Sequence, residues 1–438
     1  MRCSFVQFGD VHLGTQQYDC PERLNDFGRA WLFACEYVAN ARPDFAVCTG
    51  DLFNRFTINP VTFDQAYAGL AMLREAGVPI VDIQGNHDRT RYGEAKNWLD
   101  SFADQGLLTH LDVLTGPDGV RLRPVAPGQH RGSFVEWSGC RIVGVRYLGA
   151  STERVLQELN PRLGELGDDG AFTILVLHAG IEGQVPRVTA ELTVEAIEPL
   201  REHVDYLALG HLHKHYTVSN LAYNGGSLET WALNEWGWER GLLHVEIDTS
   251  RPRPVSFRLI DVPRRPFVIV RLDVDQFEDP RALLRGCYER LERERARLAA
   301  DKPPVVFIDL KGRLRFGQED LPINKLEDAC REGFDPLLVQ IREDYGDRDF
   351  TTEGGVDDEA PVDRQVLEHE ILQAALARDE RYAPYAAELA TLAVDLKERA
   401  LHGSDGRDLL ERFRESLAKD ARLAEVIRTA TELARVDQ

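Results

Sequence analysis

The chain has 438 residues, of which 43% are hydrophobic, and its formal net charge is -21 at pH 7. This length exceeds what a single hydrophobic core supports, so we expect two or three domains, and the apolar content excludes wholesale disorder. The net negative charge argues against a nucleic-acid partner. Bound divalent metals and a local basic patch can nevertheless reverse the electrostatic field at one site.

The cysteines and the apolar runs point to a cellular location. The seven cysteines are odd in number, include no C-x-x-C pair and in several cases lie within apolar runs, which is typical of reduced thiols. No run approaches the roughly 20 apolar residues of a membrane span, and the N-terminus enters a strand without the pattern of a signal peptide. We expect a cytoplasmic protein with no membrane partner.

Residues 1–262 alternate apolar runs with helical patterns, which predicts an α/β layer structure. Five runs are predicted to be buried strands: Phe5–Phe8, Phe45–Cys48, Val78–Val81, Thr173–Leu177 and Tyr206–Leu209. Periodicity predicts helices over Glu22–Asn40 and from Pro60 onward. Leu242–Ile247 and Val255–Ile260 are expected to join as antiparallel strands. Together these elements predict two mixed sheets packed face to face, with helices outside.

Further domains are expected beyond a boundary at Pro263–Pro266. Residues 263–346 combine strand-like runs with helical patterns and contain no catalytic cluster, so we expect a small α+β capping domain that shapes the substrate. Residues 347–363 are polar and acidic and contain glycine, which predicts a linker. Residues 364–438 carry helices with apolar stripes, which either dock on a partner helix or coiled coil or pack as a cap on the catalytic domain.

Each of the five buried strands is followed by a short segment that contains aspartate, asparagine or histidine. The segments are Gly9–Gly14, Gly50–Asn54, Gly85–Asp88, His178–Gly180 and Gly210–His213. Because ligands bind beyond the carboxyl ends of strands in open α/β sheets, we expect these side chains to converge. One such pair alone is more often structural, whereas five segments that all follow strands favour a metal site.

The residue types favour two divalent metals that act on a phosphate ester. Two such ions about 3.5–4 Å apart activate a water and neutralise charge on the phosphate oxygens. Asp51 is the natural carboxylate to bridge them. Asp10 and His12 stand two positions apart, so both reach one side only if the chain has already turned after the strand. Mixed imidazole and carboxylate ligands suit manganese, iron or zinc better than magnesium, and we favour manganese.

The set D-x-H, G-D, G-N-H-D, H and G-H-x-H resembles that of calcineurin-like metallophosphoesterases. The arrangement of domains over essentially the whole chain is similar to that of the SbcD-type nuclease subunit of the double-strand-break repair complex. This resemblance implies a four-layer α-β-β-α sandwich and a metal-dependent DNA exonuclease and endonuclease, cytoplasmic and associated with the nucleoid. It also implies that the C-terminal helices hold an SMC-like coiled-coil ATPase of the SbcC type, and it is compatible with a homodimer.

The resemblance also assigns roles to residues. It implies seven metal ligands: Asp10, His12, Asp51, Asn86, His178, His211 and His213. The first three and His213 would hold one ion, while Asp51, Asn86, His178 and His211 would hold the other. His87 would be the catalytic histidine, which stabilises the transition state or protonates the leaving oxygen. Asp88 would orient His87, or alternatively cap a following helix.

One departure from the family pattern concerns Asn54. Many members carry G-D-x-F-H, with a second histidine that engages the phosphodiester, and this chain has asparagine at that position. Asparagine can donate a hydrogen bond but cannot carry a proton charge near neutral pH. We expect metal binding to survive and exonuclease action to be weaker. A phosphatase, a cyclic-nucleotide phosphodiesterase and a scaffold subunit with an attenuated site therefore stay open as alternatives.

Two further groups of residues are candidates for contacts with a substrate. Arg89 and Arg91 follow the third segment and could contact a DNA backbone, although exposed arginines are common on any surface. Trp231, Trp236 and Trp238 follow the last histidine segment. Stacking on bases is the sharper interpretation of these tryptophans, and packing is the favoured one.

Overall fold

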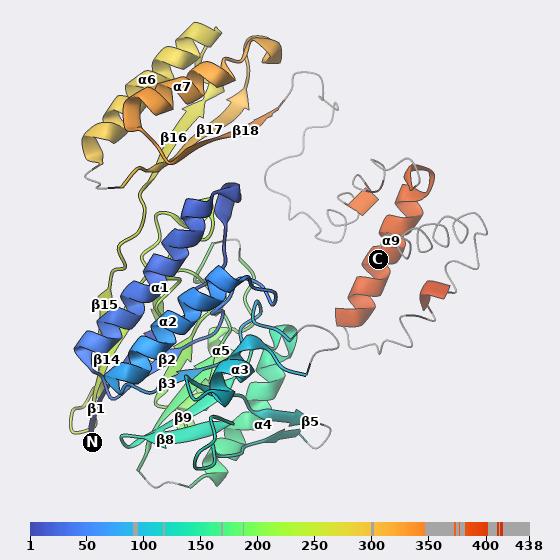
Figure 1. The fold of residues 1–438 in the computed structure, drawn as a ribbon. Helices are drawn as coiled ribbons and strands as arrows, with labels where there is room; N and C mark the ends of the chain where they lie inside the picture. Colours follow the sequence, from blue (N-terminus) through green and yellow to red (C-terminus); the bar gives the residue numbers. More distant parts are fainter. Residues whose placement is uncertain are drawn as a thin grey trace. The chain divides into compact units, whose positions relative to one another are not determined.

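A computed structural model describes residues 1–346, apart from 91–94, 117–118, 168–169, 187 and 299–301, together with residues 372–373, 376, 382–401, 410 and 412–414. The chain divides into two compact units, Met1–Arg348 and Asp349–Gln438 (Figure 1). None of the described helices is long and apolar enough to span a membrane.

The first sheet of the N-terminal unit has the strand order β15-β14-β1-β2-β3-β4-β7. Its strands are β1 (Arg2–Phe8), β2 (Phe45–Cys48), β3 (Ile80–Asp82), β4 (Thr109–Leu111), β7 (Arg131–Gly132), β14 (Leu242–Asp248) and β15 (Val255–Ile260). Neighbouring strands in the row β1-β2-β3-β4-β7 are parallel, and β14 and β15 are antiparallel additions, as predicted. Because Phe8 of β1 lies opposite Cys48 of β2, the segments after these two strands leave the sheet at the same edge.

The second sheet has the order β12-β13-β11-β10-β9-β8. Its strands are β8 (Phe134–Trp137), β9 (Cys140–Val145), β10 (Phe172–Leu177), β11 (Tyr206–Leu209), β12 (Tyr216–Val218) and β13 (Ala222–Asn224). The parallel strands β10 and β11 also end level, with Leu177 opposite Leu209. A separate antiparallel hairpin consists of β5 (Leu114–Gly116) and β6 (Gly119–Arg121).

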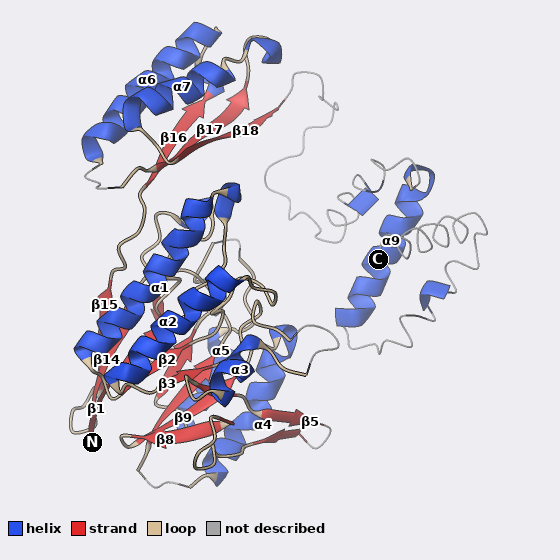
Figure 2. Ribbon diagram, viewed as in Figure 1, coloured by secondary structure: helices blue, strands red, loops and turns tan. Residues whose placement is uncertain are grey.

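Helices cover the outer faces of both sheets (Figure 2). They are α1 (Pro21–Ala41), α2 (Pro60–Ala76) and α3 (Trp98–Asp104) on the first sheet, and α4 (Thr152–Glu165) and α5 (Val194–Ile197) on the second. Side chains alternate along the strands: Val6 and Phe8 of β1 pack under the helices, whereas Phe5 belongs to the core between the sheets. The predicted pair of sheets with helices outside is confirmed.

Local sequence sets the ends of α2. The side chain of Asn59 accepts a hydrogen bond from the backbone N–H of Thr62 at 2.9 Å, and Pro60 occupies the first helical position. At the other end, Gly77 adopts a left-handed conformation with φ of 74°, which glycine tolerates best. The helix therefore begins and ends where its capping residues stand, and the chain returns directly into β3.

Residues 267–346 contain a three-stranded sheet of order β16-β17-β18, flanked by two helices. The elements are β16 (Phe267–Asp273), α6 (Pro280–Arg297), β17 (Val305–Arg313), α7 (Ile323–Phe334) and β18 (Leu338–Gly346). All strand pairs are parallel and helices alternate with strands, so this unit is α/β rather than the α+β unit expected. The reason is that a helical crossover between successive strands returns the chain in the same direction.

The second unit is described mainly by α9 (Ala386–Leu401). Its predicted apolar stripe lies on one helix, where Leu392 is buried and Leu389 and Leu396 are half-buried. The predicted linker at 347–363 lies outside the described residues, as does most of the predicted helical region beyond residue 401.

Candidate metal centre

The strand ends of the two sheets bring the five polar segments together. Asp10, His12, Asp51 and His211 all have positive φ, between 48° and 78°, which is rare for residues with a side chain. The first two loops are joined by backbone hydrogen bonds, including Asp10 N to Gly50 O at 3.0 Å. The chain has therefore turned after β1, as the spacing of Asp10 and His12 required, and both side chains are buried in the same cluster.

One half of the cluster lies around His12 and His213. The Nε2 atoms of these two histidines are 3.1 Å apart. Asp10 Oδ1 lies 3.9 Å from Nε2 of His213, and Asp51 Oδ2 lies 3.9 Å from Nε2 of His12. Asp10, His12 and His213 can each direct one ligand atom at a common ion, since the three atoms lie within 4.8 Å of one another.

The other half of the cluster lies around His178. Its Nε2 atom is 3.3 Å from Asp51 Oδ2 and 3.0 Å from Asn86 Oδ1. The same oxygen of Asn86 lies 3.0 Å from Nδ1 of His211. Asp51 Oδ2 thus approaches histidines of both halves, which is the position that a bridging carboxylate needs. The structure brings all seven sequence-predicted ligands together.

The charges of the cluster fit divalent cations. Asp10 and Asp51 are each 1% exposed, and their ion pairs among the described residues are all with histidines. Burial opposes ionisation of Asp51, but the pKa of this carboxyl is lowered because His178 lies beside it. Burial likewise opposes the charged form of His178, yet Asp51 raises its pKa to about 10. Buried carboxylates and imidazoles of this kind are the ligand set of transition-metal sites.

Glycines in the segments make room for the ligands. A Cβ atom on Gly85 would lie 2.0 Å from Oδ1 of Asp51, a distance that is too short for any residue with a side chain. Gly50 has a φ of +95°, and a Cβ there would lie 2.7 Å from Nδ1 of His178. The G-D and G-N-H-D patterns therefore have a steric reason: the backbone of each loop passes against a ligand delivered by another strand.

His87 lies at the edge of the cluster, half-buried. Its Nδ1 atom is 2.8 Å from the backbone carbonyl of Asn54, and its backbone N–H donates to Asp51 Oδ1 at 2.8 Å. Because a carbonyl oxygen only accepts, Nδ1 carries the proton and Nε2 is the nitrogen with the free lone pair. The ring centroid of His87 lies 4.9 Å from that of His12.

Asp88 has a different role from the two predicted for it. It is 4% exposed, and its carboxylate accepts hydrogen bonds from three backbone N–H groups, those of Leu52, Phe53 and Gly85. The carbonyl of Asn54, not Asp88, holds the imidazole of His87. The next described helix, α3, begins at Trp98 and is capped by Asn97 rather than by Asp88. Its carboxylate fastens the second segment to the third, because loop amides without strand partners need an acceptor.

The side chain of Asn54 is fixed by a tryptophan. Trp231 Nε1 lies 3.0 Å from Asn54 Oδ1, and an indole N–H can only donate, so the amide oxygen faces the ring. The amide nitrogen of Asn54 is the donor that remains. The Trp231 ring is half-buried and lies 5.6–6.1 Å from the rings of His12, His87 and His213. Trp231 is therefore packed against the centre, in line with the favoured interpretation, whereas Trp236 is 45% exposed.

Arg89 is exposed near the second half of the cluster. Its guanidinium lies 5.1 Å from the ring centroid of Tyr147, and that ring lies 5.2 Å from His211. Arg91, the other predicted substrate contact, lies outside the described residues.

Two glutamates at the centre have no counterpart in the sequence motifs. Glu235 Oε1 lies 2.9 Å from Nδ1 of His213, and Glu191 Oε1 lies 3.1 Å from Nε2 of His211. Glu235 ends a single 3-10 turn and Glu191 stands in a loop, each about 20 residues from the histidine that it contacts. No spacing or neighbouring motif distinguishes them from other glutamates, so the sequence contained no signal for them.

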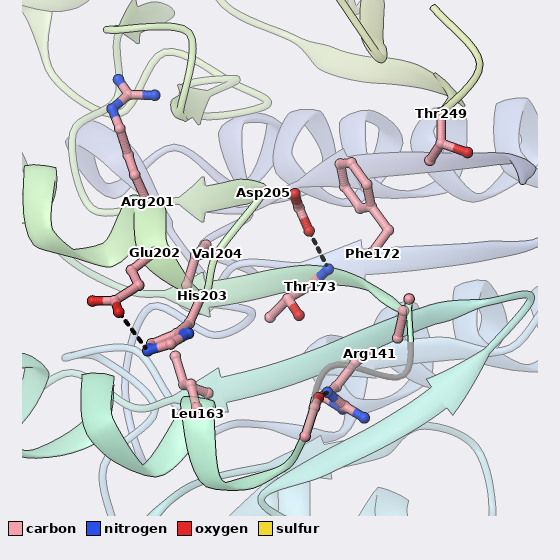
Figure 3. A pocket seen from close by; sticks show the side chains of 14 residues that line it. Arg141, Leu163, Phe172, Thr173, Arg201, Glu202, His203, Val204, Asp205 and Thr249 are labelled. Carbon is pink, nitrogen blue, oxygen red and sulfur yellow. Dashed lines mark hydrogen bonds and ion pairs between the residues drawn. The ribbon is translucent and has the colours of Figure 1, made fainter.

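A cavity of about 520 Å³ lies elsewhere in the second sheet (Figure 3). Phe172 and Asp205, at the amino ends of β10 and β11, line it, whereas the ligands follow the carboxyl ends of these strands. Its charged groups have partners: the carboxylate of Asp205 accepts the backbone N–H of Thr173 at 2.8 Å, and Arg201 pairs with Glu198 at 2.7 Å. None of the seven candidate ligands lines this cavity.

Comparison with known proteins finds a match in the part of the chain that contains all seven candidate ligands. Residues 3–215 match the family described as calcineurin-like phosphoesterase. A protein of Archaeoglobus fulgidus named DNA double-strand break repair protein Mre11 is 32% identical over an alignment of 244 positions, which covers 53% of this chain and 51% of that protein. The protein of the same name from Aeropyrum pernix is 24% identical over an alignment of 409 positions, which covers 86% of this chain and 93% of the relative. The chain thus matches about half the length of the first relative and nearly all of the second.

Proposed function

We propose that the protein is a metal-dependent DNA nuclease of a double-strand-break repair system, because residues 3–215 match the calcineurin-like phosphoesterase family. The observation that carries the proposal is the convergence of seven buried or half-buried ligand side chains from five strand ends. The similarity to two archaeal proteins named for break repair supports DNA as the substrate.

The proposed reaction is hydrolysis of a phosphodiester bond. Two divalent ions, when bound, supply a nucleophile from water near neutral pH and neutralise charge on the phosphate. Asp10, His12 and His213 would hold one ion, and Asn86, His178 and His211 the other, with the Asp51 carboxylate shared between them. The mixture of imidazole, amide and carboxylate ligands favours Mn²⁺ over Mg²⁺.

His87 is the proposed general acid. The carbonyl of Asn54 holds its Nδ1–H at 2.8 Å, and Asp51 holds its backbone N–H, so the ring is fixed from two sides. A protonated Nε2 that faces the reacting phosphate can deliver its proton to the leaving oxygen. The same ring can also donate a hydrogen bond to that oxygen as negative charge develops on it.

Asn54 and Arg89 are the proposed contacts to the DNA backbone. Trp231 occupies the amide oxygen of Asn54, so the amide N–H groups are directed to another acceptor, and a phosphate oxygen fits this donor. Arg89 is exposed over Tyr147, where its charge can attract the next phosphate along the strand. Arg91 remains a proposed contact of the same kind.

The proposed partner is a coiled-coil ATPase of the SbcC type, held by the C-terminal helices, in the cytoplasm at the nucleoid. The apolar stripe of α9 supports this role because such stripes dock on partner helices. A homodimer is a second proposal. Val61 and Tyr67 on α2, and Phe56 before it, are 38–51% exposed, and exposed apolar side chains of this size suit a contact with a second copy.

The test uses the full chain loaded with Mn²⁺. We expect it to cleave single-stranded and hairpin DNA, and to lose this activity in the presence of a chelator. Turnover of small phosphomonoesters without cleavage of any DNA would instead identify a phosphatase. Metal binding without hydrolysis of either substrate would leave the scaffold alternative. A shortened chain that ends at residue 346 is expected to keep nuclease activity and to lose binding to the ATPase.

A further inference from the structure

Glu235 is a buried carboxylate that is fixed at both oxygens. Its side chain is 7% exposed, and Oε1 lies 2.9 Å from Nδ1 of His213. Its Oε2 accepts the backbone N–H of Trp231 at 3.2 Å and a guanidinium N–H of Arg240 at 3.3 Å. Arg240 is itself fully buried and also donates to Ser227 Oγ at 2.8 Å. Glu235 therefore has one orientation available, with Oε1 directed at His213.

This contact decides which nitrogen of His213 can bind a metal. A carboxylate only accepts, so Nδ1 of His213 must carry a proton. The other nitrogen, Nε2, is then the one with a free lone pair, and it faces His12 Nε2 at 3.1 Å and Asp10 Oδ1 at 3.9 Å. A carboxylate behind a ligating histidine also makes the imidazole a stronger ligand.

Glu191 makes a similar contact with His211, but through the other ring nitrogen. Its Oε1 lies 3.1 Å from Nε2 of His211, and its Oε2 accepts the backbone N–H of Gly180 at 2.9 Å. The side chain is 10% exposed. His211 is thereby protonated at Nε2, so its Nδ1 is the nitrogen that faces Asn86. The two histidines of Gly210–His213 thus present opposite ring nitrogens to the centre.

We propose that Glu235 and Glu191 are positioning residues, one for each ion, and that each fixes the tautomer of one histidine ligand. This inference rests on the proposed two-metal function. Each glutamate is expected to set the affinity of one ion and to leave the other ion nearly unchanged, since His213 and His211 belong to different halves of the cluster.

The substitution Glu235→Gln gives a sharp test because of the groups around Oε2. Trp231 N–H and Arg240 both donate there, so the glutamine must place its oxygen on that side and its NH₂ group against His213. An NH₂ group donates, so the proton of His213 moves from Nδ1 to Nε2, the nitrogen that faces the ion. Glu235→Asp keeps a carboxylate and should retain more affinity than Glu235→Gln.

The experiment is a calorimetric titration of the metal-free full chain with Mn²⁺. We expect two sites in the native protein and, in Glu235→Gln, a loss of about 10- to 100-fold in the affinity of one site. Glu191→Gln should weaken one site by a similar factor, and the double variant should weaken both. Glu229→Gln is the matched control, because this buried glutamate of the same loop pairs with Arg23 and contacts no ligand histidine among the described residues.

The outcomes separate the inference from the proposed function. If the native protein binds no Mn²⁺, the two-metal proposal fails. If the native protein binds two ions and Glu235→Gln binds both with native affinities, only the positioning role fails. An equal loss in Glu235→Gln, Glu235→Asp and Glu229→Gln would also overturn it, because that pattern reflects general damage to the loop. Thermal unfolding of each metal-free variant shows whether the fold is intact.

Discussion

The two ends of the second sheet both carry charged and polar side chains, and they differ in how those charges are satisfied. At the carboxyl ends, the histidines that follow β10 and β11 meet Asp10 and Asp51 of the loops after β1 and β2. These two aspartates are 1% exposed, and their ion pairs among the described residues are all with histidines. At the amino ends, the cavity is lined by groups that reach water, such as the Glu202 carboxylate, 74% exposed beside His203 (Figure 3).

This difference shows why a cavity alone does not identify a site. Solvated ion pairs around an open hollow contribute little and need no ligand. Buried carboxylates that meet facing imidazole nitrogens are costly unless a cation completes them. The carboxyl-end cluster is therefore built for ions, whereas the amino-end cavity is stable as it stands.

Asp51→Asn should abolish activity. The amide is nearly the same size and can still accept the N–H of His87, but it removes the charge that both halves of the cluster share. Several kcal/mol of charge stabilisation correspond to a loss of roughly 10³-fold or more in kcat. Mn²⁺ titration and DNA cleavage assays measure the effect together. Native cleavage rates in this variant would show that the carboxyl-end cluster is not the reaction site.

His87→Asn should separate catalysis from metal binding within the cluster. We expect a loss of about 10²–10⁴-fold in DNA hydrolysis, the usual contribution of a positioned acid or base, with both ions retained. An ester with a p-nitrophenolate leaving group needs no proton, so its hydrolysis should fall much less. Equal losses for both substrates would contradict the role of His87 as a proton donor.

Asn54→His should raise exonuclease activity. The new imidazole can carry a proton beside the phosphate, but it must also accommodate the indole N–H of Trp231 that now binds the amide. We expect a gain of about tenfold, less than a fully positioned acid provides. Trp231→Phe frees the same space, and the double variant should gain more. No gain in either variant would indicate that the asparagine does not limit the reaction.

Arg201→Ala tests the amino-end cavity and should have the smallest effect. Arg201 is 40% exposed and pairs with Glu198, a surface contact within one turn. We expect the free energy of unfolding to change by less than about 1 kcal/mol, with cleavage rates unaffected. Urea unfolding and the DNA assay measure both. A strong loss of activity would mean that the cavity takes part in function and that the contrast between the two ends is misdrawn.

The sequence predicted much of the fold because its signals are local. β2, β11 and β15 begin and end at the predicted residues, and the ends of α2 follow from Asn59 and Gly77. The sequence indicates less directly how strands pair. For that reason residues 267–346 were expected to form an α+β unit, whereas their strands are all parallel. The ligand types after each strand were visible for the same local reason.

The amino-acid sequence by itself determined which side chains could bind ions, because each follows a strand and the ends of parallel strands meet at one edge. Only the tertiary structure decided how these side chains are held. Asp88 fastens two loops, Asn54 faces a tryptophan 177 positions away, and Glu235 and Glu191 contact histidines about 20 positions away. Such contacts depend on directional hydrogen bonds between distant loops, and no periodicity or spacing in the chain encodes them.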